Sequence, residues 1–198
     1  MEKQRTTKIV ALSALFMAII GMSVAFAAMS TQLQIDGSAE FRSPGWDVRF
    51  VVGSLNVTTS TYASTTTPTL TANNLGPFQA VLTRPGDSVT FTFDVTNAGG
   101  INARIDQILR NGVVGGMPDC VGLSTDGATA VADAAIVCGN LTYTLTYTDT
   151  GLPVAVNDYL DATTTRNLTL TLAYTGTTLP TDDVRIDGLG ITINFLQR

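Results

Sequence analysis

Two cysteines, Cys120 and Cys138, carry the most distinctive side-chain chemistry in this sequence. In an exported protein an even number of cysteines predicts a disulfide, because thiols oxidise outside the reducing cytoplasm. Such a bridge closes the loop from residue 120 to residue 138 and contributes roughly 3 kcal/mol of stability. The alternative is a pair of free thiols. The surrounding sequence has no spacing typical of a metal site.

Several aspartates are the other candidates for chemistry. Paired carboxylates can flank a glycosidic bond, and carboxylate oxygens can hold calcium. No spacing matches a known calcium loop, and the turn-like surroundings of the carboxylate pairs favour solvated loop charges. The pairs are Asp158 with Asp161 and Asp182 with Asp183, and the calcium candidates are Asp126, Asp133, Asp182 and Asp183.

The sequence has no histidine. Ser-His-Asp and Cys-His arrangements and an H-E-x-x-H zinc helix are therefore excluded. We predict that the protein is not an enzyme and needs no cofactor, and we assign no catalytic or metal-binding residue. Lysine is confined to Lys3 and Lys8, and Leu179-Pro180-Thr181 lacks the hydrophobic tail of a sortase signal. Any assembly should therefore be non-covalent.

The charge of the chain is acidic. The formal net charge is −5, and the first eight residues contribute +2 through Lys3, Arg5 and Lys8 against Glu2. The remainder is therefore near −7, from −5 minus +2. Nucleic-acid binding is disfavoured, because neutralising phosphates requires a basic face. An acidic surface suits a soluble exported protein.

Residues 1–27 have the pattern of a signal peptide helix. A short basic start precedes a long apolar run, and Ala25-Phe26-Ala27 supplies small residues for signal peptidase. We predict cleavage between Ala27 and Ala28, secretion, and contact with the membrane only through this leader. One alternative is an uncleaved anchor, since the run is long enough to span a bilayer. Another is a retained pilin helix, but Lys8-Ile9 lacks the glycine and glutamate expected there.

Residues 28–41 alternate between apolar and polar side chains with period two, which predicts one extended strand. The strand has two possible places. It can be an ordinary first strand of its own sheet, or it can be a donor strand that completes the sheet of a neighbouring copy. Its apolar edge carries Met29, Leu33, Ile35, Ala39 and Phe41.

Residues 42–198 are predicted to form one all-β domain, an antiparallel β-sandwich of jelly-roll type. Trp46 is expected to face the core from a strand over 46–52, and 88–95 should be the central strand. We expect a weak strand and a loop over 56–74, and a surface excursion over 111–139 with a helical turn near 130–137. The other strands are expected around 78–82, 101–105, 141–147, 168–174 and 189–195.

Four segments together resemble the TasA and camelysin-like family of exported proteins. The segments are AFAAMST at the end of the leader, QLQIDGSAEFRSPGWDVRF, LTRPGDSVTFTFDVTNAGGINARI and the C-terminal ITINFLQR. The most specific parts are Trp46-Asp47-Val48 and the stretch from Pro85-Gly86-Asp87 to Asn97-Ala98-Gly99. The cysteine region and the threonine-rich loop have no counterpart in the family.

The resemblance implies a jelly-roll subunit of extracellular biofilm-matrix filaments, assembled by donor-strand exchange with residues 28–41 as the donor strand. The implied partners are further copies, head to tail, and minor or anchoring filament subunits. Camelysin-like members are described as metallopeptidases, but a chain without histidine does not carry that activity over. The alternatives are a monomeric surface or carbohydrate-binding sandwich, with Tyr62 and the threonine-rich loop as its surface, and a secreted enzyme that uses carboxylates.

Overall fold

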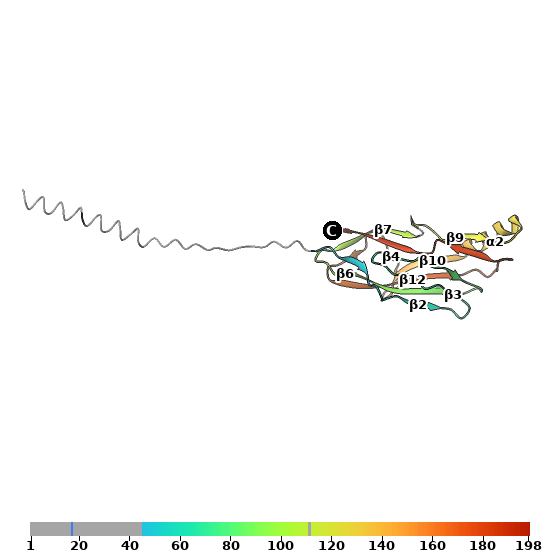
Figure 1. Cartoon of the computed structure of the whole chain (residues 1–198), viewed down its shortest axis with the longest axis horizontal. Helices are drawn as coiled ribbons and strands as arrows, with labels where there is room; N and C mark the ends of the chain where they lie inside the picture. Colours follow the sequence, from blue (N-terminus) through green and yellow to red (C-terminus); the bar gives the residue numbers. More distant parts are fainter. Residues whose placement is uncertain (1–16, 18–44, 111) are drawn as a thin grey trace, which may run out of the picture. The chain divides into compact units, whose positions relative to one another are not determined.

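The computed structural model describes Met17, residues 45–110 and residues 112–198. The predicted signal peptide, its cleavage site between Ala27 and Ala28, and the predicted donor strand 28–41 lie outside the described residues. Residues Ser43–Arg198 form one compact unit, and its described part consists of antiparallel strands and one helix (Figure 1). The all-β prediction for this part of the chain is confirmed.

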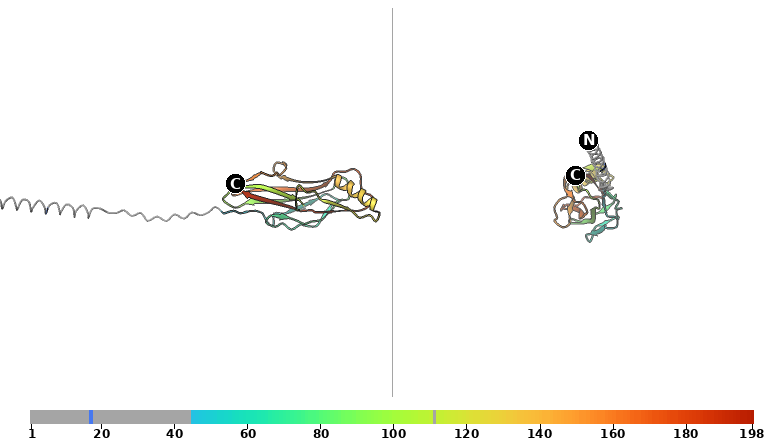
Figure 2. Two further views of the ribbon diagram at one scale, coloured as in Figure 1. Left: turned by 90° about the horizontal axis from the view of Figure 1, so that it is seen from above. Right: turned by 90° about the vertical axis from the view of Figure 1, so that its left-hand side faces the viewer.

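Two five-stranded antiparallel sheets form most of the domain (Figure 2). The first has the order β1 (Val48–Phe50), β6 (Ser88–Asn97), β12 (Thr164–Tyr174), β10 (Leu141–Tyr147), and β2 (Asn56–Thr59) also pairs with β6. The second has the order β11 (Tyr159–Leu160), β7 (Ala103–Arg110), β14 (Ile191–Gln197), β4 (Asn74–Leu75), and β8 (Val113–Val114) also pairs with β7. Two small ribbons pair β13 (Val184–Asp187) with β9 (Asp119–Gly122) and β3 (Ser64–Thr65) with β5 (Ala80–Val81).

The two large sheets share one hydrophobic core. In β6, Val89, Phe91 and Phe93 are fully buried, because alternate side chains of a strand point to the same face. Phe93 packs edge to face on Phe50 of β1, with ring centroids 5.0 Å apart. Ile193 of the second sheet joins the same cluster. The predicted central strand is confirmed, since β6 lies between β12 and the edge formed by β1 and β2.

The prediction that Trp46 faces the core is wrong. The strand expected over 46–52 is reduced to β1, and Trp46 precedes it with 38% of its surface exposed. The reason is the end of the neighbouring strand: β1 pairs with β6 only from Val48, opposite Asn97, where β6 ends. Phe50 fills the core position instead.

Asn97 and Gly99 hold the turn between β6 and β7. The fully buried Asn97 side chain donates to the carbonyls of Ile101 (2.8 Å) and Leu160 (3.2 Å), and its Oδ1 accepts from Gly99 N–H (3.1 Å). A Cβ on Gly99 would lie 2.3 Å from the Gly45 carbonyl oxygen. This motif therefore places the start of the described domain against the β6–β7 turn.

Asp87 holds the turn between β5 and β6. Its buried carboxylate accepts hydrogen bonds from Thr83 N–H (2.8 Å), Arg84 N–H (2.8 Å) and the Ser60 hydroxyl (2.9 Å). Desolvation raises the pKa of this carboxyl, but the hydrogen bonds together lower it further, so its pKa lies below the ordinary value of 3.8. The charged form of Asp87 is thus favoured in the folded protein.

We expect Asp87→Asn to lower the free energy of unfolding at pH 7 by about 1 to 3 kcal/mol, because buried N–H donors lose a charged acceptor. The folded pKa lies below the unfolded one, so this contribution is complete above the ordinary pKa and is lost as the pH falls through the folded pKa. Urea unfolding of both proteins at several pH values should show the difference narrowing below about pH 4. A difference that persists in acid would contradict this role, and Asp149→Asn, at an exposed carboxylate, is the control.

The region predicted as a surface excursion is more ordered than expected. It contains β8, β9 and α2 (Gly127–Gly139), and the predicted helical turn near 130–137 is part of this longer helix. Asp126, one of the calcium candidates, is the N-cap: its carboxylate accepts from Thr129 N–H at 3.0 Å. The hydrogen bond from the Thr129 hydroxyl lowers the pKa of Asp126. A capping role accounts for this carboxylate.

Candidate functional site

A groove of about 480 Å³ lies between β5 and β13. Tyr174 of β12 and Val137 of α2 contribute to its lining, so it reaches down to the core of the domain. Leu82, just after β5, and Ile186 of β13 line its two sides. Exposed apolar side chains at the surface of the groove form what we term the rim: Val81, Leu123 and Leu179.

One wall of the groove is a strand edge. β5 pairs with β3 on its far side, where Thr66 N–H donates to the Gln79 carbonyl at 3.0 Å. Bonding groups alternate between the two edges of an antiparallel strand. The peptide groups of Ala80 and Leu82 are therefore directed away from β3, towards the groove.

The opposite wall is also a strand edge. β13 pairs with β9 on its far side, where Leu123 N–H donates to the Asp183 carbonyl at 2.9 Å. The same alternation directs the peptide groups of Val184 and Ile186 into the groove. Between residues 45–110 and 112–198, no hydrogen bond joins these groups to those of Ala80 or Leu82. The groove thus has an apolar floor between two unpaired strand edges, which is the arrangement that binds an extended peptide.

The two walls are joined at one end of the groove. Phe78 N–H donates to the Leu189 carbonyl at 3.1 Å, which joins the two chain segments directly. From this bond the groove runs towards Val137 of α2, where the lining residues Leu123 and Leu179 are exposed, so we call this end the open end of the groove. On the β5 side, the lining from Gln79 to Thr83 is about 17 Å long at 3.3 Å per residue. A second hollow of about 380 Å³ adjoins the closed end and shares Gln79 and Ile186 with the groove.

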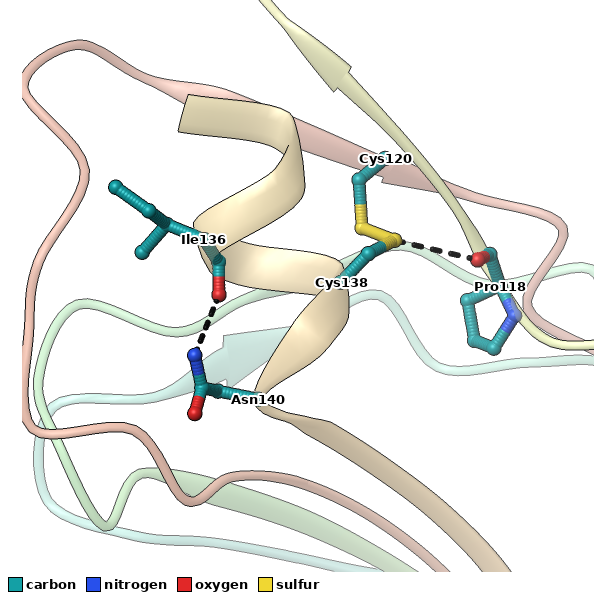
Figure 3. Close-up of a disulfide and its surroundings, with 5 residues drawn as sticks. All are labelled: Pro118, Cys120, Ile136, Cys138 and Asn140. Carbon is teal, nitrogen blue, oxygen red and sulfur yellow. Dashed lines mark hydrogen bonds between the residues drawn. A yellow bond between two sulfur atoms is a disulfide. The ribbon is translucent and has the colours of Figure 1, made fainter. Parts of the chain in front are cut away.

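A disulfide fastens the β13 side of the groove. Cys120 of β9 and Cys138 of α2 are bridged, with their Cα atoms 5.9 Å apart, which confirms the predicted pairing (Figure 3). The Cys138 sulfur also lies 3.5 Å from the Pro118 carbonyl oxygen, a close contact, since a bridged sulfur has no proton to donate. At the end of the helix, the Asn140 amide donates to the Ile136 carbonyl at 2.8 Å.

Asp133 supports the same wall from the buried side of α2. Only 1% of its surface is exposed, and its carboxylate accepts from Thr181 N–H (2.8 Å) and Asp182 N–H (2.9 Å). It therefore anchors the segment that leads into β13. These two hydrogen bonds account for Asp133, one of the calcium candidates, because α2 packs this face against the segment. Among the described residues, no cluster of three or more acidic, histidine or cysteine side chains could hold a metal ion.

Gly122 allows α2 to pack closely on β9. A Cβ at this position would lie 2.0 Å from the Ala130 carbonyl oxygen. A side chain at residue 122 would therefore push the helix away from the ribbon that forms the groove wall. The disulfide, the Asp133 hydrogen bonds and this contact all hold one unit, made of β9, α2 and β13.

The other predicted carboxylate candidates serve loops or lie at the surface. The Asp158 carboxylate accepts from the Tyr147 hydroxyl (3.0 Å) and from Ala155 N–H (2.8 Å) and so holds the loop before β11. The expectation that this charge is simply solvated is therefore wrong. Burial and the neighbouring Asp158 carboxylate raise the pKa of the Tyr147 hydroxyl. Asp182 and Asp183 are exposed where the groove opens.

Tyr62, the predicted sugar-binding aromatic, is already stacked. The Arg84 guanidinium carbon lies 3.4 Å from the centre of the Tyr62 ring, and the Thr83 hydroxyl donates to the Tyr62 carbonyl at 3.2 Å. The guanidinium covers one face of the ring, so that face is not free for a sugar.

Sequence reasoning missed β13 and hence the groove. The signal was present: Val184-Arg185-Ile186-Asp187 alternates apolar and charged residues as a short strand does. Its brevity, and the acidic turn before it, hid the pattern. Only the pairing with β9 shows that one edge of this strand is left open.

No known protein family, curated protein or solved structure matches this chain. None of the helices among the described residues is both long enough and apolar enough to cross a membrane. The disulfide indicates that the folded domain resides in a non-reducing environment.

Proposed function

We propose that this protein is the structural subunit of a non-covalent extracellular filament, and that residues 28–41 of one copy insert as a donor strand into the β5–β13 groove of the next. The observation that carries the proposal is the groove itself, an apolar floor between two unpaired strand edges. The resemblance to the TasA and camelysin-like family points to the same assembly. We further propose that the two facing sheets are a jelly-roll sandwich.

The energetics of the donor strand favour a site with two edges. Burial of Met29, Leu33, Ile35 and Phe41 contributes about 6 to 12 kcal/mol, at about 1.5 to 3 each. Ordering fourteen backbone residues costs roughly 14 to 28 kcal/mol, at about 1 to 2 each. Side-chain burial alone therefore does not suffice. The β5–β13 groove offers main-chain hydrogen bonds on both sides of an inserted strand, together with an open apolar floor.

The position of the groove favours insertion into a neighbour. The chain enters the domain beside the β6–β7 turn, whereas the groove opens near α2, at the other end of β6 (Figure 1). The ten residues of β6 are about 33 Å long. A strand that turned back to its own groove would use about ten residues to cover this distance, so only its first residues would reach the groove, and Ile35, Ala39 and Phe41 would stay outside it. With a head-to-tail partner no part of the segment is used up in crossing its own domain, and such contacts propagate into fibres.

Electron microscopy of culture supernatant from cells that express the full reading frame tests this function. We expect filaments one subunit wide that dissociate in denaturant without reducing agent, because no covalent bond joins the copies. A chain in which the leader 1–27 is joined directly to Phe41, and which is therefore still exported, should give no filaments of normal length. Dispersed single molecules from the complete chain would overturn the proposal and favour a monomeric surface protein.

A further inference from the structure

Trp46, the only tryptophan of the chain, lies exposed where the N-terminal segment joins the domain. Gly100 N–H donates to the Gly45 carbonyl at 3.0 Å, and Ala98 N–H to the Asp47 carbonyl at 2.8 Å. These bonds fix Trp46 at the β6–β7 turn, an end of the domain that we term the turn end. An indole is a large apolar group that single folded domains usually cover.

Other apolar groups are exposed at the turn end. Leu196 of β14 and Tyr159 of β11 both pair with Arg104, on opposite sides of β7. Leu196 is 44% exposed, and the Tyr159 ring lies under the Arg198 guanidinium, 4.5 Å from it. Trp46, Leu196 and Tyr159 are thus apolar side chains exposed near this end, beside the cationic Arg104 and Arg198.

The outer face of the first sheet, which forms a flank of the domain, is polar. On the outer face of the first sheet, one row across four strands consists of threonines: Thr144, Thr171, Thr90 and Thr58. Hydroxyl groups of this kind remain hydrated at little cost. Contacts through the ends of the domain therefore cover apolar surface and leave a polar flank in water.

The opposite end of the domain carries α2 (Figures 1 and 2). The groove reaches this end, because Val137 of α2 is part of its lining. The rim residues Leu123 and Leu179 are about half exposed there. Head-to-tail assembly brings the turn end of one copy to this end of the next.

We propose that Trp46 packs on the groove rim of the neighbouring copy, against Leu123 and Leu179, and is the central aromatic anchor of the subunit contact. This inference rests on the proposed function. If the donor strand fills the groove up to Phe41, the chain from Phe41 to Trp46 spans at most about 18 Å, so the indole of the donor copy is within reach of the rim. Tryptophan is the residue most often found as such an anchor.

Intrinsic fluorescence tests the contact, because Trp46 is the only indole. On assembly of the wild-type chain we expect emission to shift to shorter wavelength and acrylamide quenching to fall. The full chain with Leu33→Asp and Ile35→Asp provides the monomer baseline.

Trp46→Ala should raise the concentration needed for filaments about 30-fold, the loss typical of an interface anchor, and Trp46→Phe should recover part of it. Val52→Ser, at a residue 72% exposed beyond β1, is the control and should assemble normally.

The outcomes separate this inference from the proposed function. Filaments whose tryptophan stays as accessible as in the monomer overturn the contact and leave donor-strand assembly intact. A monomer baseline already shifted and protected from quencher also overturns it, because the indole is then covered within its own chain. Absence of wild-type filaments overturns the proposed function and this inference with it.

Discussion

Aspartate at both Leu33 and Ile35 is expected to abolish filaments and leave a folded, secreted monomer. In the proposed donor-strand complex these two side chains face the apolar floor of the groove, so each aspartate would place an unpaired charge there. Two such charges cost at least about 6 kcal/mol, which corresponds to more than about 10⁴-fold in subunit affinity. Because both positions precede the compact unit, the unfolding midpoint of the monomer should match that of wild-type monomer. Electron microscopy and light scattering of the secreted protein measure the loss.

The matched control places the same charges on the other edge of the strand. Gln32→Asp with Gln34→Asp adds two carboxylates next to the same positions, but these side chains face water in the inserted strand. This control chain should form filaments at nearly wild-type concentration. Equal loss in both variants would show that added charge, and not burial in a groove, prevents assembly.

The long alternating strands could be predicted from the sequence because each repeats its pattern over enough residues. Ser88–Val95 and Leu141–Tyr147 lie in β6 and β10 as expected. Burial alternates residue by residue throughout β6 and over the first five residues of β10. For such strands the pattern alone fixes which face is buried.

The short strands and the position of Trp46 could not be predicted, because partners distant in sequence decide them. β13 is four residues long, and its place depends on β9, which is itself held to α2 by the disulfide. Trp46 continues an apolar alternation, but the strand beside it has ended at Asn97. A periodicity argument assumes that the sheet extends as far as the pattern does.

The acidic residues show the same limit for site prediction. Asp87, Asp126 and Asp133 all bind backbone N–H groups, and each fixes one turn or helix end. The sequence offered the last two as calcium candidates only because carboxylate oxygens can be calcium ligands. What distinguishes them is the local supply of N–H donors, which only the folded chain reveals.

Removal of the disulfide by Cys120→Ser with Cys138→Ser is expected to disable the groove before it unfolds the domain. The bridge contributes about 2 to 5 kcal/mol, and at about 2 to 4 °C per kcal/mol for a domain of this size the unfolding midpoint should fall by roughly 4 to 20 °C. Without the bridge, the contact between β9 and α2 is weakened first, and these two elements position β13. We therefore expect a folded monomer, stable at room temperature, whose groove no longer holds a donor strand.

A mixing experiment distinguishes a damaged groove from a merely unstable protein. The double-serine chain keeps residues 28–41 intact, so it should still insert its own strand into a wild-type groove and then stop growth, because it cannot accept the next copy. Small amounts added to wild-type protein should shorten the filaments, as should the chain with Leu33→Asp and Ile35→Asp, which can accept but not donate. An equimolar mixture of these two variants should give dimers that grow no further. If the double-serine chain forms filaments of wild-type length by itself, the disulfide does not support the acceptor site.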